Sequence, residues 1–280
     1  MLGAIIGDIA GSRFEWKNYK GKDFEFFHKD CEFTDDSVMT IAVAQALMDT
    51  APKYNDLDKA SVKRMQEIGH LYPDAGYGGH FQTWLMERQP KPYGSYGNGA
   101  PMRVSACGFM AKSLDEAKRL SYEVTKVSHN HPEGIKGAEA TTVAVYMAWN
   151  GKSKEDIKKY IVKNYYKLDF TIDSIRPKYR YDISSQGSVP PAIEAFLEGK
   201  DFEDVIRNAI SIGGDSDTIG AIAGGIAEAY FGIPAEMQKK AKTYLDDRLI
   251  KIVDDFYKKL PAKKSMSDNS FFGKIMSMFE

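Results

Sequence analysis

The sequence has 280 residues, a length that suits one large domain with a sizeable hydrophobic core. Its 38 basic and 39 acidic side chains give a formal net charge of −1, so there is no electrostatic reason to expect nucleic acid as a partner. The two cysteines, Cys31 and Cys107, have no paired spacing, which argues against a disulfide framework and favours a reducing compartment.

The beginning of the chain, "MLGAIIGDIAGSRFEW", lacks a basic segment and meets an acid too early for a secretory signal. No apolar run reaches the roughly 18 residues of a membrane-spanning helix. We therefore expect a soluble cytoplasmic protein.

Apolar residues recur at three- and four-residue spacing through most of the chain, which predicts helices. Ser153 stands three residues before Asp156, close in form to a capping box. No run of alternating strands with hairpin turns is present, so the predicted fold class is all-α. The predicted helical segments are 37–50, 114–132, 134–152, 153–166, 188–200, 201–214, 219–230 and 235–260.

Two segments depart from this pattern. Residues 69–99 are rich in Gly, Pro and aromatic residues and should be mostly loop around one short helix, and residues 171–190 should be an exposed connection. Without a linker or a repeat, we expect one domain over residues 1–261. Residues 262–280 read as a polar spacer and a short amphipathic tail, which either docks on the domain or frays; a helix for a partner or membrane surface is the alternative.

Two turns place acids and hydroxyls before apolar helices, in "FTDDSVMT" and "GGDSDTIGAIAGG". Each turn taken alone can be a helix cap, with its acids complementing the helix dipole. The Gly- and Ala-rich second helix should pack closely among other helices, which would bury its first turn in a cleft. If the two turns meet there, carboxylates about 4 Å apart repel by roughly 4 kcal/mol per pair. Such a cluster needs protons or divalent cations, and oxygen ligands favour Mg²⁺, Mn²⁺ or Ca²⁺ over zinc.

Five stretches in this order resemble the ADP-ribosylglycohydrolase family, which includes dinitrogenase reductase-activating glycohydrolases. They are "GAIIGDIAGSRFE", "FTDDSVMT", "GSYGNGAPMR", "SHNHPEGIKGAEA" and "GGDSDTIGAIAGGIAEAYFG", between about residues 3 and 234. The resemblance implies an all-α fold with a binuclear Mg²⁺ or Mn²⁺ centre. It also implies hydrolysis of the bond between the anomeric carbon of ADP-ribose and an acceptor group.

Carried over by position, the resemblance implies a set of six metal ligands, which are Thr34, Asp35, Asp36, Asp215, Asp217 and Thr218. Asp35 and Asp36 would also take part in catalysis. Ser37 stands where the family often has Thr and keeps the hydroxyl. Pro101 replaces a frequent Ala at a first helical position, where proline is tolerated.

Glu15 matches a family glutamate near the metals that positions or deprotonates the attacking water or gates the site; without the resemblance, a solvated acid before Trp16 is the favoured interpretation. The loop "GSYGNG" matches the family's phosphate-binding loop, although a plain turn is the simpler interpretation of glycines alone. The residues assigned to the diphosphate and its riboses are Ser95, Tyr96, Gly97, Asn98 and Gly99.

The family places a ligand-contacting histidine in "SHNHP", and we assign it to His129 in preference to His131. From the residues alone, a purely structural pair, with one histidine buried and hydrogen-bonded and the other exposed, is an equally good interpretation. Gly78, Gly79 and Phe81 should lie in a loop that covers the ribose farther from the adenine.

The reaction that the resemblance implies passes through an oxocarbenium-like transition state. The expected substrate is a protein that carries mono-ADP-ribosyl-arginine, with ADP-ribose as product and two Mg²⁺ or Mn²⁺ ions as cofactors. Two alternatives stay open. One is a hydrolase of another linkage, namely serine, O-acetyl-ADP-ribose or nucleic acid. The other is a non-enzymatic ADP-ribose sensor.

Overall fold

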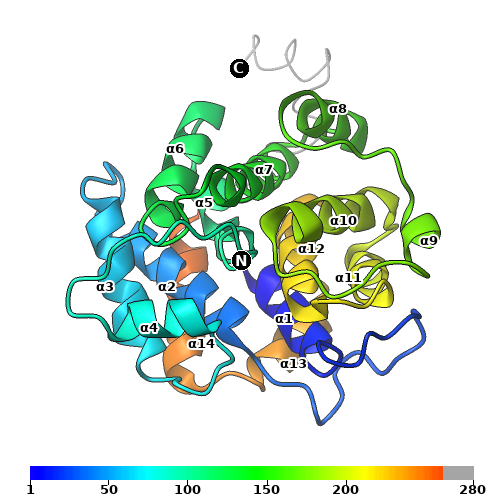
Figure 1. Ribbon diagram of the computed structural model, residues 1–280, viewed down its shortest axis with the longest axis horizontal. Helices are drawn as coiled ribbons and strands as arrows, with labels where there is room; N and C mark the ends of the chain where they lie inside the picture. The colour runs from blue at the N-terminus through cyan, green and yellow to red at the C-terminus, as the bar shows by residue number, and fades with distance from the viewer. Residues whose placement is uncertain (261–280) are drawn as a thin grey trace, which may run out of the picture.

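The computed structural model describes residues 1–260 and confirms the all-α class. Within that range it has fourteen α-helices, one short 3₁₀ helix and no named β-strand (Figure 1). Their bounds are α1 Leu2–Ser12, α2 Asp35–Thr50, α3 Leu57–Gly69, α4 Gly79–Met86, η1 Pro101–Arg103, α5 Ser105–Met110, α6 Leu114–Thr125, α7 Pro132–Trp149, α8 Lys154–Asn164, α9 Ile172–Ile175, α10 Ser185–Glu198, α11 Phe202–Ser211, α12 Ser216–Phe231, α13 Ala235–Lys242 and α14 Asp247–Lys259.

The helices α1 and α12 lie together at the centre of the molecule. Glycines on both helices let the two backbones approach closely, since a Cβ added to Gly7 would lie 2.0 Å from the carbonyl oxygen of Gly220. Every residue of α12 from Ser216 to Ala229 is buried. The central position predicted for the Gly- and Ala-rich helix is therefore confirmed.

Other helices surround this central pair. The helices α10 and α11 pack against α12, and α2 contacts α1, α12, α3 and α14. Figure 1 shows α2, α3, α4 and α14 on one side of the pair, with α10 and α11 on the other. As a result, the N-terminal turns of α2 and α12 both lie beside α1, although about 180 residues separate them in the sequence.

Three sequence expectations need correction. Residues 171–190 are not a continuous exposed connection, because α9 lies within them and α10 begins at Ser185, with Ser184 as its N-cap. The segment 235–260 forms two helices, and Asp246 caps the second. The N-terminal segment, for which we predicted no helix, forms α1. Ser153 does cap α8, as expected, by accepting from the Asp156 N–H at 3.1 Å.

The proposed boundary at residue 261 and the amphipathic tail lie outside the described residues. Within residues 1–260, no helix combines the length and the apolar character needed to cross a membrane.

Candidate functional site

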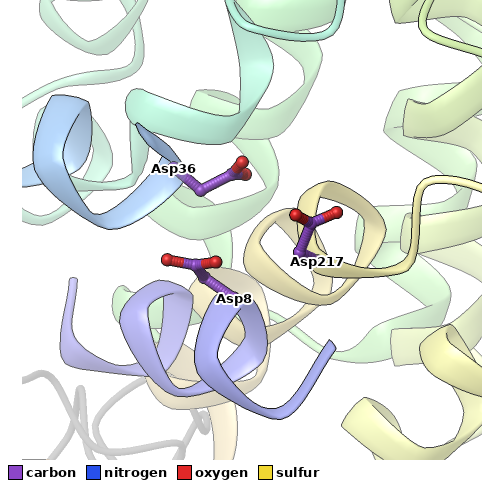
Figure 2. A group of neighbouring side chains, drawn as sticks. All are labelled: Asp8, Asp36 and Asp217. Atoms are coloured by element: carbon purple, nitrogen blue, oxygen red, sulfur yellow. The ribbon is translucent and has the colours of Figure 1, made fainter. Parts of the chain in front are cut away.

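Three central helices each direct one buried aspartate into a common space. These are Asp8 of α1, Asp36 of α2 and Asp217 of α12 (Figure 2). One carboxylate oxygen from each lies within 4.8 Å of the other two. The Oγ1 hydroxyl of Thr218 also donates to Oδ2 of Asp36 at 3.2 Å. The two acidic turns therefore meet in the folded chain, and α1 adds a third acid to them.

Asp8 holds the first turn of α2 in place. Its Oδ2 atom accepts from the backbone N–H groups of Thr34 (2.9 Å) and Ser37 (3.1 Å), and also from the Ser37 hydroxyl. Its Oδ1 atom accepts from the Thr34 hydroxyl at 2.8 Å. Three donors therefore saturate Oδ2, and with the Thr34 hydroxyl on Oδ1 only one acceptor position is left, on Oδ1. Asp8 therefore acts mainly as a clamp between α1 and α2.

The sequence analysis did not single out Asp8 as a site residue. The signal was an acid inside "IIGDIAG", an apolar segment with glycines on the face that packs against α12. This is the same combination of buried acid and small-residue helix that drew attention to the other two turns.

Asp36 has the opposite character, because its Oδ1 atom is buried and has no hydrogen-bond partner within the described residues. A bare carboxylate oxygen in a buried site is costly unless a cation or a proton satisfies it. This orphaned oxygen, beside Asp8 and Asp217, is what an oxygen-seeking divalent cation would require.

A second group of three acids shares Asp217 with the first. Glu15, Asp215 and Asp217 each offer a carboxylate oxygen within 4.8 Å of the others. Asp215 also accepts from the side-chain amide of Asn98 at 2.7 Å. Positive backbone φ angles at Gly213 and Gly214, of 68° and 75°, turn the chain just before Asp215. Because Asp217 belongs to both groups, the two groups lie next to each other, and each of them could hold a cation.

The remaining predicted ligands are placed differently. Asp35 is half-buried and lines the cleft, but it belongs to neither group of three acids. The Thr34 hydroxyl accepts from the Asp36 N–H at 3.3 Å and donates to Asp8, so it caps α2. The Thr218 hydroxyl is engaged with Asp36. Both hydroxyls thus support the carboxylates in the structure as it stands.

Burial raises the pKa values of all these acids. It raises the pKa of Asp8 to about 6, and, with the neighbouring charge of Asp215, it raises the pKa of Glu15 to about 7. The pKa values of Asp35, Asp36 and Asp217 lie well above the ordinary range, first through burial and then through nearby carboxylates, and that of Asp215 is raised mainly by burial. No ion pair with Lys, Arg or His relieves this cluster within residues 1–260. Its acids must hold protons or cations.

Divalent cations should therefore stabilise the protein more at about pH 8 than at about pH 5.5. The folded-state pKa values are raised, so as pH rises from about 4 the unfolded chain releases these protons first, and the metal-free protein loses stability up to about pH 7. Cations bind the ionised carboxylates, and a concentration about a hundred times Kd adds roughly 3 kcal/mol. Melting curves with Mg²⁺, Mn²⁺ or EDTA at both pH values check this. A shift that is absent, or that is larger at low pH, would contradict a cation site.

All of these acids except Asp8 line a cleft of about 520 Å³. Its other walls come from the glycine loop after Tyr93, the start of α4, and the segment around Tyr181. The predicted residues that line it are Glu15, Asp35, Asp36, Gly78, Gly79, Phe81, Ser95, Gly97, Asn98, Gly99, His129, Asp215, Asp217 and Thr218.

The glycine loop lines the cleft, but three of its backbone N–H groups already have partners. The Gly94 N–H donates to Oδ1 of Asn130 at 2.7 Å. The Gly97 N–H donates to the Ser95 hydroxyl at 3.1 Å, and the Asn98 N–H donates to the Ile183 carbonyl at 2.8 Å. Tyr96 does not line the cleft; its side chain is 51% exposed and packs edge-on against His131. The loop therefore offers fewer free donors than its glycine content suggests.

His129 is buried and lines the cleft, whereas His131 is exposed and caps α7 by accepting from the Glu133 N–H. Gly78 precedes α4, but Gly79 and Phe81 belong to its first turn, so the expectation that they lie in a loop is wrong for those two. The Phe81 ring is buried and stacks on Trp84, with ring centroids 5.2 Å apart.

The family model described as ADP-ribosylglycohydrolase matches residues 1–265. The chain belongs to this family. It is accordingly an enzyme that hydrolyses a glycosyl bond, and the predicted all-α ADP-ribosylglycohydrolase fold is confirmed.

Relatives of known name agree with this assignment. ADP-ribosylhydrolase ARH3 of Homo sapiens is 25% identical to this member of the family, over 87% of this chain and 88% of the relative. ADP-ribosylarginine hydrolase Tri1 of Pseudomonas putida is 25% identical over 98% of this chain and 81% of the relative. The solved structure of an ADP-ribosylglycohydrolase-related protein complex has the same fold, with a TM-score of 0.67 at 20% identity, covering 92% of this chain and 95% of that one.

Proposed function

We propose that this ADP-ribosylglycohydrolase removes mono-ADP-ribose from arginine side chains of proteins, using two Mg²⁺ or Mn²⁺ ions. The observation that carries the metal dependence is the pair of three-acid groups that share Asp217, together with the orphaned Oδ1 atom of Asp36. Six neighbouring acids without a basic partner, five of which line the cleft, favour divalent cations as their counter-charge.

Asp36 and Asp217 would hold one ion, with the remaining lone pair of Asp8 Oδ1 beside it. Asp215 and Asp217 would hold the other, with the Glu15 carboxylate beside it. The proposal keeps Asp35, Thr34 and Thr218 as further ligands. When bound, such ions orient the hydroxyls of a ribose and lower the pKa of a water molecule.

Glu15 is the residue best suited to proton transfer. It is half-buried, it lines the cleft, and the Tyr181 hydroxyl donates to its Oε1 atom at 3.1 Å. In this position its carboxyl group can accept a proton from the attacking water or return one to a departing guanidine.

An exposed aromatic pair at the mouth of the cleft favours arginine as the acceptor. Trp16 and Tyr181 stack with their ring centroids 5.0 Å apart, and Trp16 is 78% exposed. Both residues line the cleft, and Trp16 follows Glu15 directly in the chain. A guanidinium group stacks well on an aromatic face and is attracted to nearby carboxylates. The full-length similarity to an ADP-ribosylarginine hydrolase supports the same acceptor.

Replacing Trp16 by alanine should weaken the acceptor contact and leave ADP-ribose binding unchanged. The loss of one cation–π contact predicts a KM for ADP-ribosyl-arginine protein that is about three- to thirtyfold higher. Steady-state kinetics and calorimetry with ADP-ribose measure the two effects. Tyr122→Ala, which removes another exposed aromatic side chain away from the cleft, is the control. An equal loss of ADP-ribose affinity would place Trp16 in the nucleotide site instead.

The function itself is tested with substrates that carry ADP-ribose on arginine, serine, O-acetyl or nucleic acid linkages, each with Mg²⁺, Mn²⁺ or EDTA. We expect metal-dependent release of ADP-ribose from the arginine linkage. Release from another linkage alone would reassign the acceptor. Release that persists in EDTA would overturn the metal dependence. Binding of ADP-ribose without release from any linkage would indicate a sensor.

A further inference from the structure

A buried hydrogen-bond chain stands behind the wall of the cleft formed by the glycine loop. It runs from Arg103 at the end of η1, through Ser128, to His129 after α6. Nη2 of Arg103 lies 2.7 Å from Oγ of Ser128, and that oxygen lies 2.9 Å from Nδ1 of His129. Arg103 and Ser128 are fully buried, and His129 is 4% exposed.

The direction of each proton in this chain follows from the number of donors and acceptors. The Arg103 guanidinium can only donate, so the Ser128 oxygen accepts from it. The Ser128 hydroxyl proton has no acceptor among the described residues other than Nδ1 of His129. If Nδ1 carried a proton, this buried hydroxyl proton would have no partner, at a cost that native structures avoid. Nδ1 is therefore the acceptor, and the imidazole proton is on Nε2.

Burial and the positive charge of Arg103 also disfavour a second proton on the His129 imidazole. Burial, and then the charge of Arg103, hold the pKa of His129 well below its usual range. Burial lowers the pKa of Arg103 only to about 10, so Arg103 stays charged at neutral pH. His129 is thus a neutral imidazole with one N–H group.

That N–H group faces the glycine loop. A Cβ placed on Gly99 would lie 3.2 Å from Nε2 of His129, and one placed on Gly97 would lie 3.6 Å from it. Within residues 1–260, Nε2 donates to no other residue, and His129 lines the cleft. The loop has few free backbone donors of its own, because Gly97 and Asn98 already use theirs. An additional donor at this point would complete a site for an oxygen-rich ligand.

We propose that Ser128 and Arg103 are positioning residues that hold His129 as the Nε2–H tautomer, so that its one N–H group donates to an oxygen of a nucleotide diphosphate in the glycine loop. The identity of the ligand rests on the proposed function, whereas the tautomer does not. Arg103 borders the cleft, but its side chain is fully buried, and its guanidinium carbon lies 5.3 Å from the centroid of the Phe81 ring. Its effect on the tautomer of His129 passes through the hydrogen bond that it donates to Ser128.

The tautomer is tested directly by ¹⁵N NMR of the wild-type protein labelled at histidine nitrogens. We expect Nε2 of His129 to be protonated and Nδ1 to be unprotonated throughout the range from about pH 6 to about pH 8. A protonated Nδ1, or a doubly protonated ring at about pH 7, would overturn the proposal whether or not the enzyme acts on ADP-ribose.

Two variants test the relay. Ser128→Ala should give a mixture of tautomers and weaken ADP-ribose binding about tenfold by calorimetry, while kcat changes little because the contact is made before and during the reaction. Arg103→Met should also give mixed tautomers. The matched control is Ser121→Ala. Ser121 lies in α6, and its buried hydroxyl has no hydrogen-bond partner among the described residues.

Binding of ADP, which has the diphosphate but lacks the second ribose, shows which of these two groups accepts from Nε2 of His129. An equal loss of ADP and ADP-ribose affinity in Ser128→Ala would place the Nε2 contact on the diphosphate, as proposed. A loss confined to ADP-ribose would move it to the second ribose and correct that part of the proposal. A folded Ser128→Ala protein with unchanged tautomer and affinity would overturn the relay. If the wild-type protein bound neither nucleotide, the proposed function would fail while the tautomer result still stood.

Discussion

Asp217→Asn should reduce kcat by about a thousandfold, because this one carboxylate belongs to both groups of three acids. In the wild-type protein, the Thr218 N–H donates to Oδ1 of Asp217 at 2.9 Å. Asparagine keeps the shape of the side chain and an oxygen that can accept this bond. It removes the negative charge on which both cation positions depend. The rate of ADP-ribose release at saturating Mg²⁺ or Mn²⁺ measures the effect.

The same variant should not lose stability in EDTA. Burial and neighbouring carboxylates hold the pKa of Asp217 well above its ordinary range, so its ionised form is disfavoured in the folded state. A neutral side chain removes that repulsion, and the metal-free variant should melt at or above the wild-type temperature. Glu194→Gln, which neutralises a buried acid paired with Lys158, should leave kcat unchanged. An Asp217→Asn protein that unfolds early in EDTA would mean that Asp217 is structural.

Gly7→Ala should destabilise the protein by at least about 3 kcal/mol, at the upper end for an overpacked core. The added Cβ would lie 2.0 Å from the Gly220 carbonyl oxygen, and both atoms belong to backbones that cannot rotate away. The helices α1 and α12 would have to separate, which would also move Asp8 away from Asp217. Chemical denaturation in the presence of EDTA measures the change in the free energy of unfolding.

Gly79→Ala provides the comparison, because nothing lies within 4 Å of a Cβ at that position. We expect its free energy of unfolding to stay within about 0.5 kcal/mol of the wild-type value. Equal stability of the Gly7→Ala and Gly79→Ala proteins would contradict the close contact between the two central helices.

The local sequence pattern was enough to predict most helices. Where a helix begins or ends depends in part on tertiary contacts, which the pattern does not contain. The apolar spacing of residues 37–50 and the capping serine at Ser153 act within one helix, so they can be read from the chain. The start of α10 could not be read in this way. Ser185 is held there because its backbone N–H donates to the carbonyl oxygen of Tyr96, which lies far away in the sequence. The residues around Ser185 are polar, and a polar composition is typical of a loop.

The two acidic turns could also be found from local sequence pattern, but the residues that support them could not. Asp36 and Asp217 stand before apolar runs, which marked them as buried acids. Asp8 acts through Thr34 and Ser37, and Ser128 acts through His129; such roles depend on contacts between helices. The family resemblance fixed the order of the motifs but carried no information on these supporting contacts.

The clamp that Asp8 forms on α2, and the group it completes with Asp217, also constrain the order of events in folding. The acids come from positions 8, 36 and 217, so the site joins the first and last thirds of the chain and depends on contacts of large sequence separation. During synthesis, α1 and the start of α2 would emerge long before α12 exists to pack against them. Two carboxylates alone cannot complete either group, so tight cation binding would come only after α12 has docked. In a folding experiment, uptake of Mn²⁺ would therefore serve as a late signal, reporting the arrival of the native core rather than the formation of individual helices.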